Sequence, residues 1–195
     1  MELIKSIGQF DKMIDNKIIG MPNLINSNIN FRGKNNILVL DNNIELKNVI
    51  LDFNGDNSFV YIGSDLNDSF KLSISSNSLG FIGRDVIIGT SVKLNIFENQ
   101  NLVIGDDCVI EDNVIISTSD AFPIYTFTNK QRINFSNSVF IGDHVWLMSN
   151  SFINKGVRIG SGTIIDNYTV LPSNSIIPSN LYLSGNPAKI IKTLI

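Results

Sequence analysis

Residues 141–177 have the sequence IGDHVWLMSNSFINKGVRIGSGTIIDNYTVLPSNSII, and this stretch decides the fold. In steps of six residues, every step falls on Ile or Leu, and the fourth residue after each is small or β-branched. A helical face would recur at about 3.6 residues, and an alternating strand at about two. A six-residue unit of short strand and turn explains the pattern, because one aliphatic side chain points inward and one small residue fills the corner. Such units stack as a parallel β-helix, which makes the protein all-β. The aliphatic positions are Ile141, Leu147, Ile153, Ile159, Ile165, Leu171 and Ile177, and the small positions are Val145, Ser151, Val157, Thr163, Thr169 and Ser175.

The same rhythm occurs upstream, in two further runs. Ile-Gly pairs mark the repeats, and the pairs that begin at Ile141 and Ile159 are 18 residues apart, which equals three six-residue units. This spacing predicts a coil with three flat sides. Between about residues 37 and 76 the sequence is rich in strand-forming residues, but its six-residue phase cannot be fixed. Asn, Asp and Gly fill the gaps there, and these residues tolerate the left-handed backbone of tight corners. The two upstream runs are Ile82, Ile88, Leu94 and Ile104, Ile110, Ile116.

The composition of the chain excludes several functional classes. The net charge of −3 and the lack of a basic stripe argue against nucleic acid as a partner. No cluster of His, Cys or carboxylates has the spacing of metal ligands, so no metal site is expected. The single cysteine, Cys108, cannot form an internal disulfide and occupies a small inward position, where it is expected to pack as a core residue. No apolar run of about 18 residues predicts a membrane span, and the first ten residues lack a signal-peptide core, so we expect a cytoplasmic protein.

Three segments divide the chain. Residues 1–30 are expected to form an N-terminal lead-in that caps the first coil, with residues 4–13 as a short amphipathic stretch. Residues 31–186 form the parallel β-helix. Residues 187–195 are expected to form a short C-terminal helix over the last coil, because Pro187 is suited to a first helical turn.

The six-residue rhythm breaks after Ile116 and resumes at Ile141. Residues 119–138, SDAFPIYTFTNKQRINFSNS, are therefore predicted to form a loop that leaves the coil. A loop of this length within a compact repeat is often functional, although a tolerated insertion is the alternative. Four aromatic residues make it too apolar for a free solvated tip, so we expect it to pack on a neighbouring subunit or to line a site.

Several segments carry a resemblance to a known family. The segments IGDHVW, KGVRIGSGTII and SGNPAKIIK resemble, in order and spacing, the hexapeptide-repeat acyltransferases, and the resemblance extends over about residues 81–192. Within that family, ISTSDAFPIYTFTNKQRIN most resembles the bacterial sialic acid and capsular polysaccharide O-acetyltransferases. The resemblance implies a left-handed β-helix, a homotrimer, acetyl-CoA bound in clefts between subunits, and a sugar or polysaccharide as acceptor.

The resemblance also implies where the catalytic residues lie. In the family, a histidine deprotonates the sugar hydroxyl as it attacks the thioester, and a pKa near neutral suits histidine for this step. In this chain Phe122 occupies the histidine position. Trp146 matches the tryptophan of the site wall, for which packing at a subunit interface is the alternative. His144 is the only histidine, at a position that is not the base in the family, and it is the candidate for a substitute base.

Other positions are assigned by the resemblance or by their chemistry. Met148 and Tyr168 stand where small residues normally let the pantetheine arm lie against the coil, and they are expected to narrow that channel. Asp120 is expected either to orient a substrate hydroxyl or to turn the chain into the loop, and Arg132 is a candidate partner for a sugar carboxylate. Tyr125 is a further candidate in the loop. The basic residues that are candidates for CoA phosphates, or else are ordinary surface residues, are Lys155, Arg158, Lys189 and Lys192.

Three interpretations of Phe122 remain open. The chain is a natural relative whose activity is lost or rerouted, or Phe122 is an engineered replacement, or another base such as His144 acts. A general base typically contributes about 10²–10⁴-fold in rate, so the sequence predicts weak or absent acetyl transfer. The alternative class is a non-catalytic trimeric protein that binds sugar or serves as a scaffold.

Overall fold

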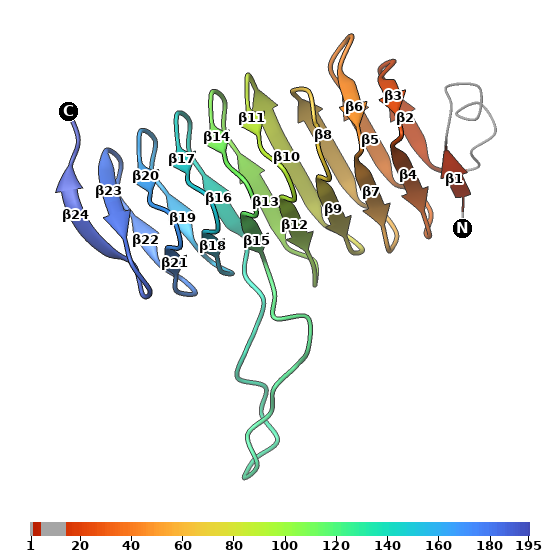
Figure 1. The fold of residues 1–195 in the computed structure, drawn as a ribbon. Coiled ribbons are helices and arrows are strands. Elements are labelled where there is room, and N and C mark those ends of the chain that lie inside the picture. Colours follow the sequence, from red (N-terminus) through yellow and green to blue (C-terminus); the bar gives the residue numbers. More distant parts are fainter. Residues whose placement is uncertain (1, 5–14) are drawn as a thin grey trace.

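The computed structural model describes residues 2–4 and 15–195, which form a parallel β-helix with three faces (Figure 1). We name the faces 1, 2 and 3; along each coil the chain passes from face 2 to face 3 to face 1. Face 1 is an eight-stranded sheet of β1 (Glu2–Ile4), β4 (Asn28–Phe31), β7 (Ile50–Phe53), β9 (Lys71–Ile74), β12 (Lys93–Ile96), β15 (Ile115–Ser117), β18 (Phe152–Ile153) and β21 (Val170–Leu171). Face 2 is an eight-stranded sheet of β2 (Lys17–Ile19), β5 (Ile37–Leu40), β8 (Phe59–Gly63), β10 (Leu79–Arg84), β13 (Asn101–Ile104), β16 (Val139–Ile141), β19 (Arg158–Ile159) and β22 (Ile176–Ile177).

Face 3 is built from two separate sheets. The pair β3 (Asn23–Ile25) and β6 (Glu45–Lys47) lies at the N-terminal end, and the bridge between Leu46 and Leu66 continues it. The second sheet has six strands: β11 (Ile87–Ile88), β14 (Val109–Ile110), β17 (Trp146–Leu147), β20 (Ile164–Ile165), β23 (Leu181–Ser184) and β24 (Lys189–Thr193). Among the described residues no helix is long and apolar enough to span a membrane.

The register between strands confirms the predicted repeat. Ile141 pairs with Ile159 and Ile159 pairs with Ile177, so these coils have 18 residues each. The N-terminal coils are longer. Ile37 pairs with Phe59, 22 residues later, and Phe59 pairs with Leu79, 20 residues later. The extra residues lengthen the strands, which have three to six residues from β5 to β10 but only two from β17 to β22, so inward positions in this part of the sequence do not recur every six residues.

The core is the single column of aliphatic side chains inside the coil. The predicted inward positions from Ile141 to Leu171 are at most 4% exposed, and the small positions from Val145 to Thr169 are at most 1% exposed. Cys108 is buried in the same column, as predicted. The interior is therefore filled by one large and one small residue per side, which is the packing that the six-residue rhythm requires.

The corners take left-handed backbone conformations, mostly at Asn, Asp and Ser. Asn and Asp adopt this conformation more readily than other non-glycine residues, because their short side chains hydrogen-bond locally. Glu98 is an exception with φ of 59°, and so are two residues with ring side chains, His144 with φ of 56° and Tyr168 with φ of 57°. Both rings lie at the edge of the prism.

The two ends of the coil differ from the prediction. The predicted C-terminal helix is wrong, because Lys189–Thr193 form strand β24, which pairs antiparallel with β23. The edge of β23 offers unpaired backbone groups, and a segment with Ile190, Ile191 and Thr193 suits a strand, whereas an isolated helix this short is marginal. At the other end, the coil already begins at Lys17, within the predicted lead-in of residues 1–30. Most of the predicted amphipathic stretch lies outside the described residues, and its first residue, Ile4, ends strand β1.

The predicted loop is present and projects far from the coil between β15 and β16 (Figure 1). It leaves from the corner between faces 1 and 2. An antiparallel bridge between Tyr125 and Arg132 joins its two branches. Large apolar side chains are exposed both in its outer part, where Phe127 is 91% exposed, and near its base, at Phe135.

Candidate functional site

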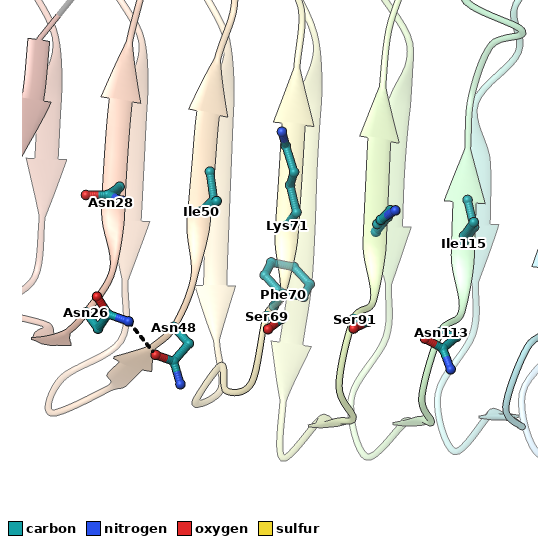
Figure 2. A pocket seen from close by; sticks show the side chains of 11 residues that line it. Asn26, Asn28, Asn48, Ile50, Ser69, Phe70, Lys71, Ser91, Asn113 and Ile115 are labelled. Atoms are coloured by element: carbon teal, nitrogen blue, oxygen red, sulfur yellow. Dashed lines mark hydrogen bonds between the residues drawn. The ribbon is translucent and has the colours of Figure 1, made fainter.

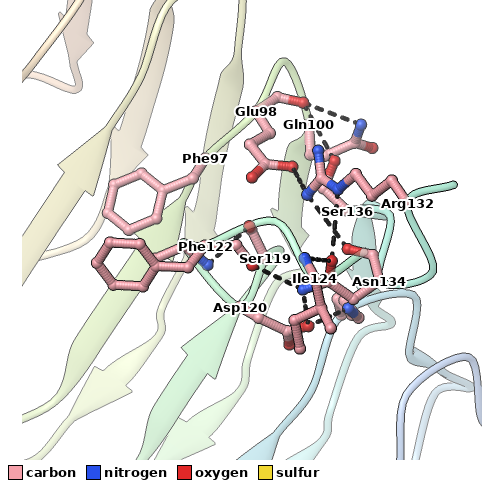
Figure 3. A network of polar contacts seen from close by, with 12 residues as sticks. Phe97, Glu98, Gln100, Ser119, Asp120, Phe122, Ile124, Arg132, Asn134 and Ser136 are labelled. Atoms are coloured by element: carbon pink, nitrogen blue, oxygen red, sulfur yellow. Dashed lines mark hydrogen bonds and ion pairs between the residues drawn. The ribbon is translucent and has the colours of Figure 1, made fainter. Parts of the chain in front are cut away.

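The base of the loop is held by a polar network centred on Asn134 (Figure 3). The Asn134 amide NH₂ donates to the Asp120 carboxylate at 2.9 Å and to the Phe122 carbonyl at 2.7 Å. Its amide oxygen accepts the Ile124 backbone N–H at 2.6 Å. One buried amide thereby fixes the backbone at positions 122 and 124 and the side chain of Asp120.

Two ion pairs tie this network to the coil. Lys155, which is only 8% exposed, donates to the Asp120 carboxylate, and Arg132 donates to Glu98 at 2.6 Å. Lys155 lies in the corner between β18 and β19, and Glu98 in the corner between β12 and β13. Both corners lie between faces 1 and 2, where the loop departs, so two neighbouring coils anchor its base.

These contacts lower the pKa values of both carboxyl groups. The pKa of Asp120 is lowered chiefly by the hydrogen bond from Lys155, with a further contribution from Asn134. Burial would raise the pKa of Glu98, but hydrogen bonds from Arg132, Ser119 and Ser136 lower it overall. A carboxylate with a lowered pKa is a weak base, so neither group is suited to take a proton from a sugar hydroxyl.

Three residues that were predicted to bind a ligand are therefore paired with other residues of the same chain. The Lys155 ammonium is buried and bound by the Asp120 carboxylate, so it anchors the loop, and its contact with CoA stays a prediction. Arg132 is engaged by Glu98 and also donates to the Asn134 carbonyl at 3.2 Å, so its side chain holds the loop. Asp120 turns the chain into the loop and is paired, consistent with the structural alternative considered for it.

Position 122 lies at the centre of this anchored segment. Its carbonyl is fixed by Asn134, whereas its ring points away from the polar network, as does that of Phe97 (Figure 3). The Phe122 side chain is 78% exposed. A side chain at this position is thus presented outward from a fixed backbone, which is the arrangement that a catalytic group requires. The phenyl ring itself has no group that titrates. Tyr125, further out on the loop, is also exposed.

A second cluster surrounds Trp146 on face 3. The Trp146 indole N–H donates to Glu111 at 2.8 Å, and Glu111 also accepts from the Ser149 hydroxyl at 2.7 Å and from the Ser149 backbone N–H at 3.0 Å. These bonds, that of the Ser149 hydroxyl above all, lower the pKa of Glu111. Glu111 was not predicted as a site residue. The register between strands could have identified it. Ile110 pairs with Leu147, so the next residue, Glu111, lies beside the strand that carries Trp146.

The other candidate residues lie at the edges of face 3. His144 is at the corner between faces 2 and 3, with its Nε2 atom 3.4 Å from the Asp107 carboxylate. Met148 and Tyr168 lie at the corner between faces 3 and 1 on successive coils, and Tyr168 is 71% exposed. Lys189 begins β24 at the C-terminal end of face 3. Lys192 pairs with Tyr182, in the row of outward residues that includes Trp146 and Ile164.

The two clusters are on opposite sides of one prism. The loop leaves from the corner between faces 1 and 2, and face 3, which carries Trp146, is the face opposite that corner. A single chain therefore does not bring Phe122 and Trp146 together.

Comparisons with known proteins identify the family. Residues 138–173 match the family model described as bacterial transferase hexapeptide (six repeats). The solved structure of the polySia-specific acetyltransferase NeuO is 33% identical to this chain, covers 93% of it and is itself covered to 83%, with a TM-score of 0.84. The chain belongs to the hexapeptide-repeat acyltransferases, and its fold is their left-handed parallel β-helix.

Two curated relatives are both polysialic acid O-acetyltransferases. The protein from Neisseria meningitidis is 32% identical over 64% of this chain, and the protein from Escherichia coli O1:K1 / APEC is 40% identical over 57% of it. The matches span only 58% and 35% of the length of those two relatives.

Proposed function

We propose that this protein is an O-acetyltransferase that uses acetyl-CoA to acetylate a hydroxyl of a sialic acid-containing capsular or other surface polysaccharide. The observation that carries the proposal is the anchored loop, which presents position 122 outward from a fixed backbone in a chain whose relatives are polysialic acid O-acetyltransferases. Acetyl-CoA is a cytoplasmic metabolite, so the proposal places the reaction in the cytoplasm.

The proposed active enzyme is a homotrimer with its sites between subunits. Two faces are apolar on the outside. On face 2, Tyr61 and Phe81 stack with ring centroids 4.8 Å apart, and face 3 exposes Ile87 and Trp146. Packing face 2 of one subunit on face 3 of the next buries both, and such a head-to-tail contact closes into a ring when the rotation fits.

This packing has a direct consequence for the site. The loop at the outer edge of face 2 then lies over the outer edge of face 3 of the neighbour. Phe122 of one subunit thereby approaches the neighbour's cluster of Trp146, Met148 and Tyr168. His144, at the corner between the two packed faces, is directed toward the threefold axis, which argues against a role as the base.

We propose that the protein as it stands transfers acetyl groups slowly, because Phe122 cannot accept a proton. Asn134 holds the backbone around position 122, so a histidine introduced there would have a well-ordered backbone. We expect Phe122→His to raise the rate by about 10²–10⁴-fold, the usual contribution of a general base.

Release of free CoA thiol tests this, with acetyl-CoA as donor and sialic acid oligomers as acceptor. The matched control is Phe127→His, which places a histidine on the exposed outer part of the same loop and should leave the rate unchanged. Equal activation by both variants, or none by Phe122→His while acetyl-CoA binds, contradicts the proposed role of position 122.

The second candidate is a non-catalytic trimer that binds sugar. The observation that favours it is the phenyl ring at position 122 together with Met148 and Tyr168 at the edge where acetyl-CoA is expected. Calorimetry separates the two, because a binding protein of this kind binds the glycan and does not bind CoA.

A further inference from the structure

A groove of about 690 Å³ runs along face 1, across the strands rather than along them (Figure 2). One wall consists of the outward residues of five neighbouring strands, which are in register. The other wall consists of the corner between faces 3 and 1. The strand residues are Asn28, Ile50, Lys71, Lys93 and Ile115, and the corner residues are Asn26, Asn48, Ser69, Ser91 and Asn113.

The dimensions of the groove fit an elongated ligand. Neighbouring strands are about 4.8 Å apart, so five strands span about 19 Å. A single sugar does not fill this length. An extended chain that lies across the strands meets the same set of groups on each successive coil.

The lining chemistry fits a glycan. Amide and hydroxyl groups line the corner wall, and one of the amide pairs is itself hydrogen-bonded, Asn26 to Asn48 at 2.8 Å. Such groups donate to and accept from sugar hydroxyls. Ile50 and Ile115 add apolar surface at intervals, which suits the C–H faces of sugar rings.

The charge of the groove fits an anionic glycan. None of its lining residues is acidic, although the chain as a whole has a net charge of −3. Lys71 and Lys93 occupy successive strands at its centre. The Asp52 carboxylate, 3.2 Å from the Lys71 ammonium, is also 3.9 Å from Arg32, so Lys71 is only partly neutralised. Within the described part of the chain, no carboxylate lies at ion-pair distance from Lys93.

The groove also points toward the proposed transfer site. Its corner row continues on the next two coils with Asn150 and then Tyr168. Backbone hydrogen bonds join this row from one coil to the next. The N–H groups of Asn113, Asn150 and Tyr168 donate to the carbonyls of Thr90, Asp112 and Ser149, respectively. The groove therefore lies on the same edge of the prism as the residue that the neighbouring loop approaches in the proposed trimer.

We propose that this groove binds an extended anionic glycan and aligns it with the transfer site at Tyr168. The inference rests on the proposed function, because it assigns a binding site on face 1 to the polysaccharide acceptor. It predicts that affinity rises with the length of the glycan until the groove is filled.

The test compares three proteins in binding to fluorescently labelled sialic acid oligomers, of two and of at least eight units, without acetyl-CoA. The groove variant is Lys71→Gln with Lys93→Gln. The matched control is Lys34→Gln with Lys47→Gln, which removes the same charge at exposed positions outside the groove. An exposed ion pair contributes about 0.2–1 kcal/mol, so losing two weakens binding of the long oligomer by about two- to thirtyfold. The short oligomer and the control variant should show little change.

Other outcomes overturn the inference. They are equal weakening by both double variants, no preference for the long oligomer, no binding of either oligomer, or equally tight binding of single-stranded DNA with the same number of charges. Thermal unfolding of each variant checks that the fold is retained, as expected because Lys93 is exposed and Asp52 keeps its contacts with Asn30 and Arg32 when Lys71 is replaced.

Acetyl transfer to the two-unit oligomer distinguishes failure of this inference from failure of the proposed function. If Phe122→His acetylates the short acceptor while the groove variant binds the long one normally, only the groove assignment fails. If no acceptor is acetylated while the groove variant alone loses binding, the groove assignment stands and the proposed function fails.

Discussion

Removal of the Asp120 carboxylate should destabilise the protein more than removal of its partner Lys155. Lys155 is 8% exposed, so Asp120→Ala leaves an ammonium group largely out of water without a counter-ion. An unpaired charge in a fully buried pair costs about 3–5 kcal/mol. The Asp120 side chain is 42% exposed, so water reaches the site and we expect about 1–2 kcal/mol. Lys155→Met removes the buried charge itself and leaves an exposed carboxylate, and should cost less than about 1 kcal/mol.

Urea denaturation at a fixed protein concentration measures both changes. The double variant Asp120→Ala with Lys155→Met should be more stable than Asp120→Ala alone. The reasoning is refuted if Lys155→Met costs as much as Asp120→Ala, or if the two effects add within about 0.3 kcal/mol, which marks independent sites.

The same pair predicts a pH dependence. The pKa of folded Asp120 is lowered below its unfolded value, which is about 3.9. Its contribution to stability is therefore complete above the unfolded pKa and is lost as the pH falls through the folded pKa. The difference in unfolding free energy between the unchanged protein and Asp120→Ala should shrink below about pH 4, and a constant difference down to pH 2 contradicts the ion pair.

Three further predictions concern other parts of the prism. Tyr168→Gly should stabilise the fold by about 1 kcal/mol, because it relieves a left-handed backbone at a residue that is 71% exposed; destabilisation in urea contradicts this. If the proposed trimer forms through face 2, Val103→Asp on the outside of that face should give monomers in sedimentation, whereas the control Ile115→Asp on face 1 should leave the assembly unchanged. The same assembly for both variants refutes face 2 as the interface. Burial raises the pKa of the Cys108 thiol to about 11, so a disulfide reagent at pH 8 should modify it only on unfolding, and rapid reaction of the native protein refutes its burial.

The sequence allowed prediction of the coil and the loop, because each depends on a local rhythm. The six-residue pattern alone assigns Leu147 and Ile153 to the interior, and its interruption after Ile116 places the loop where it is observed. The N-terminal coils could not be phased, because their strands are longer and so the inward positions do not recur every six residues. The C-terminal segment was predicted as a helix from Pro187, a local signal, whereas the open edge of β23 decided its structure.

The contacts around the candidate site were less predictable, since they join distant residues. The sequence suggested position 122 and Trp146 as candidates but gave no sign that Lys155 and Arg132 are bound within the protein. Asp120 and Lys155 are 35 positions apart, and only the stacking of coils brings them together. Glu111 was missed for the same reason, because its bond to Trp146 depends on the register of two coils separated by the loop.

The central claim is that the proposed active site is shared between subunits, because one prism keeps the loop and Trp146 on opposite sides. Mixed trimers test it, with thiol release as the readout. One parent is the unchanged chain, which has Phe122 and an intact Trp146. The other is Phe122→His with Trp146→Ala, and each parent trimer alone should be nearly inactive. Coassembled trimers should regain activity, because the new histidine of one subunit faces the intact Trp146 of the next. If the mixture remains inactive while Phe122→His alone is active, the site lies within one subunit and the account is wrong.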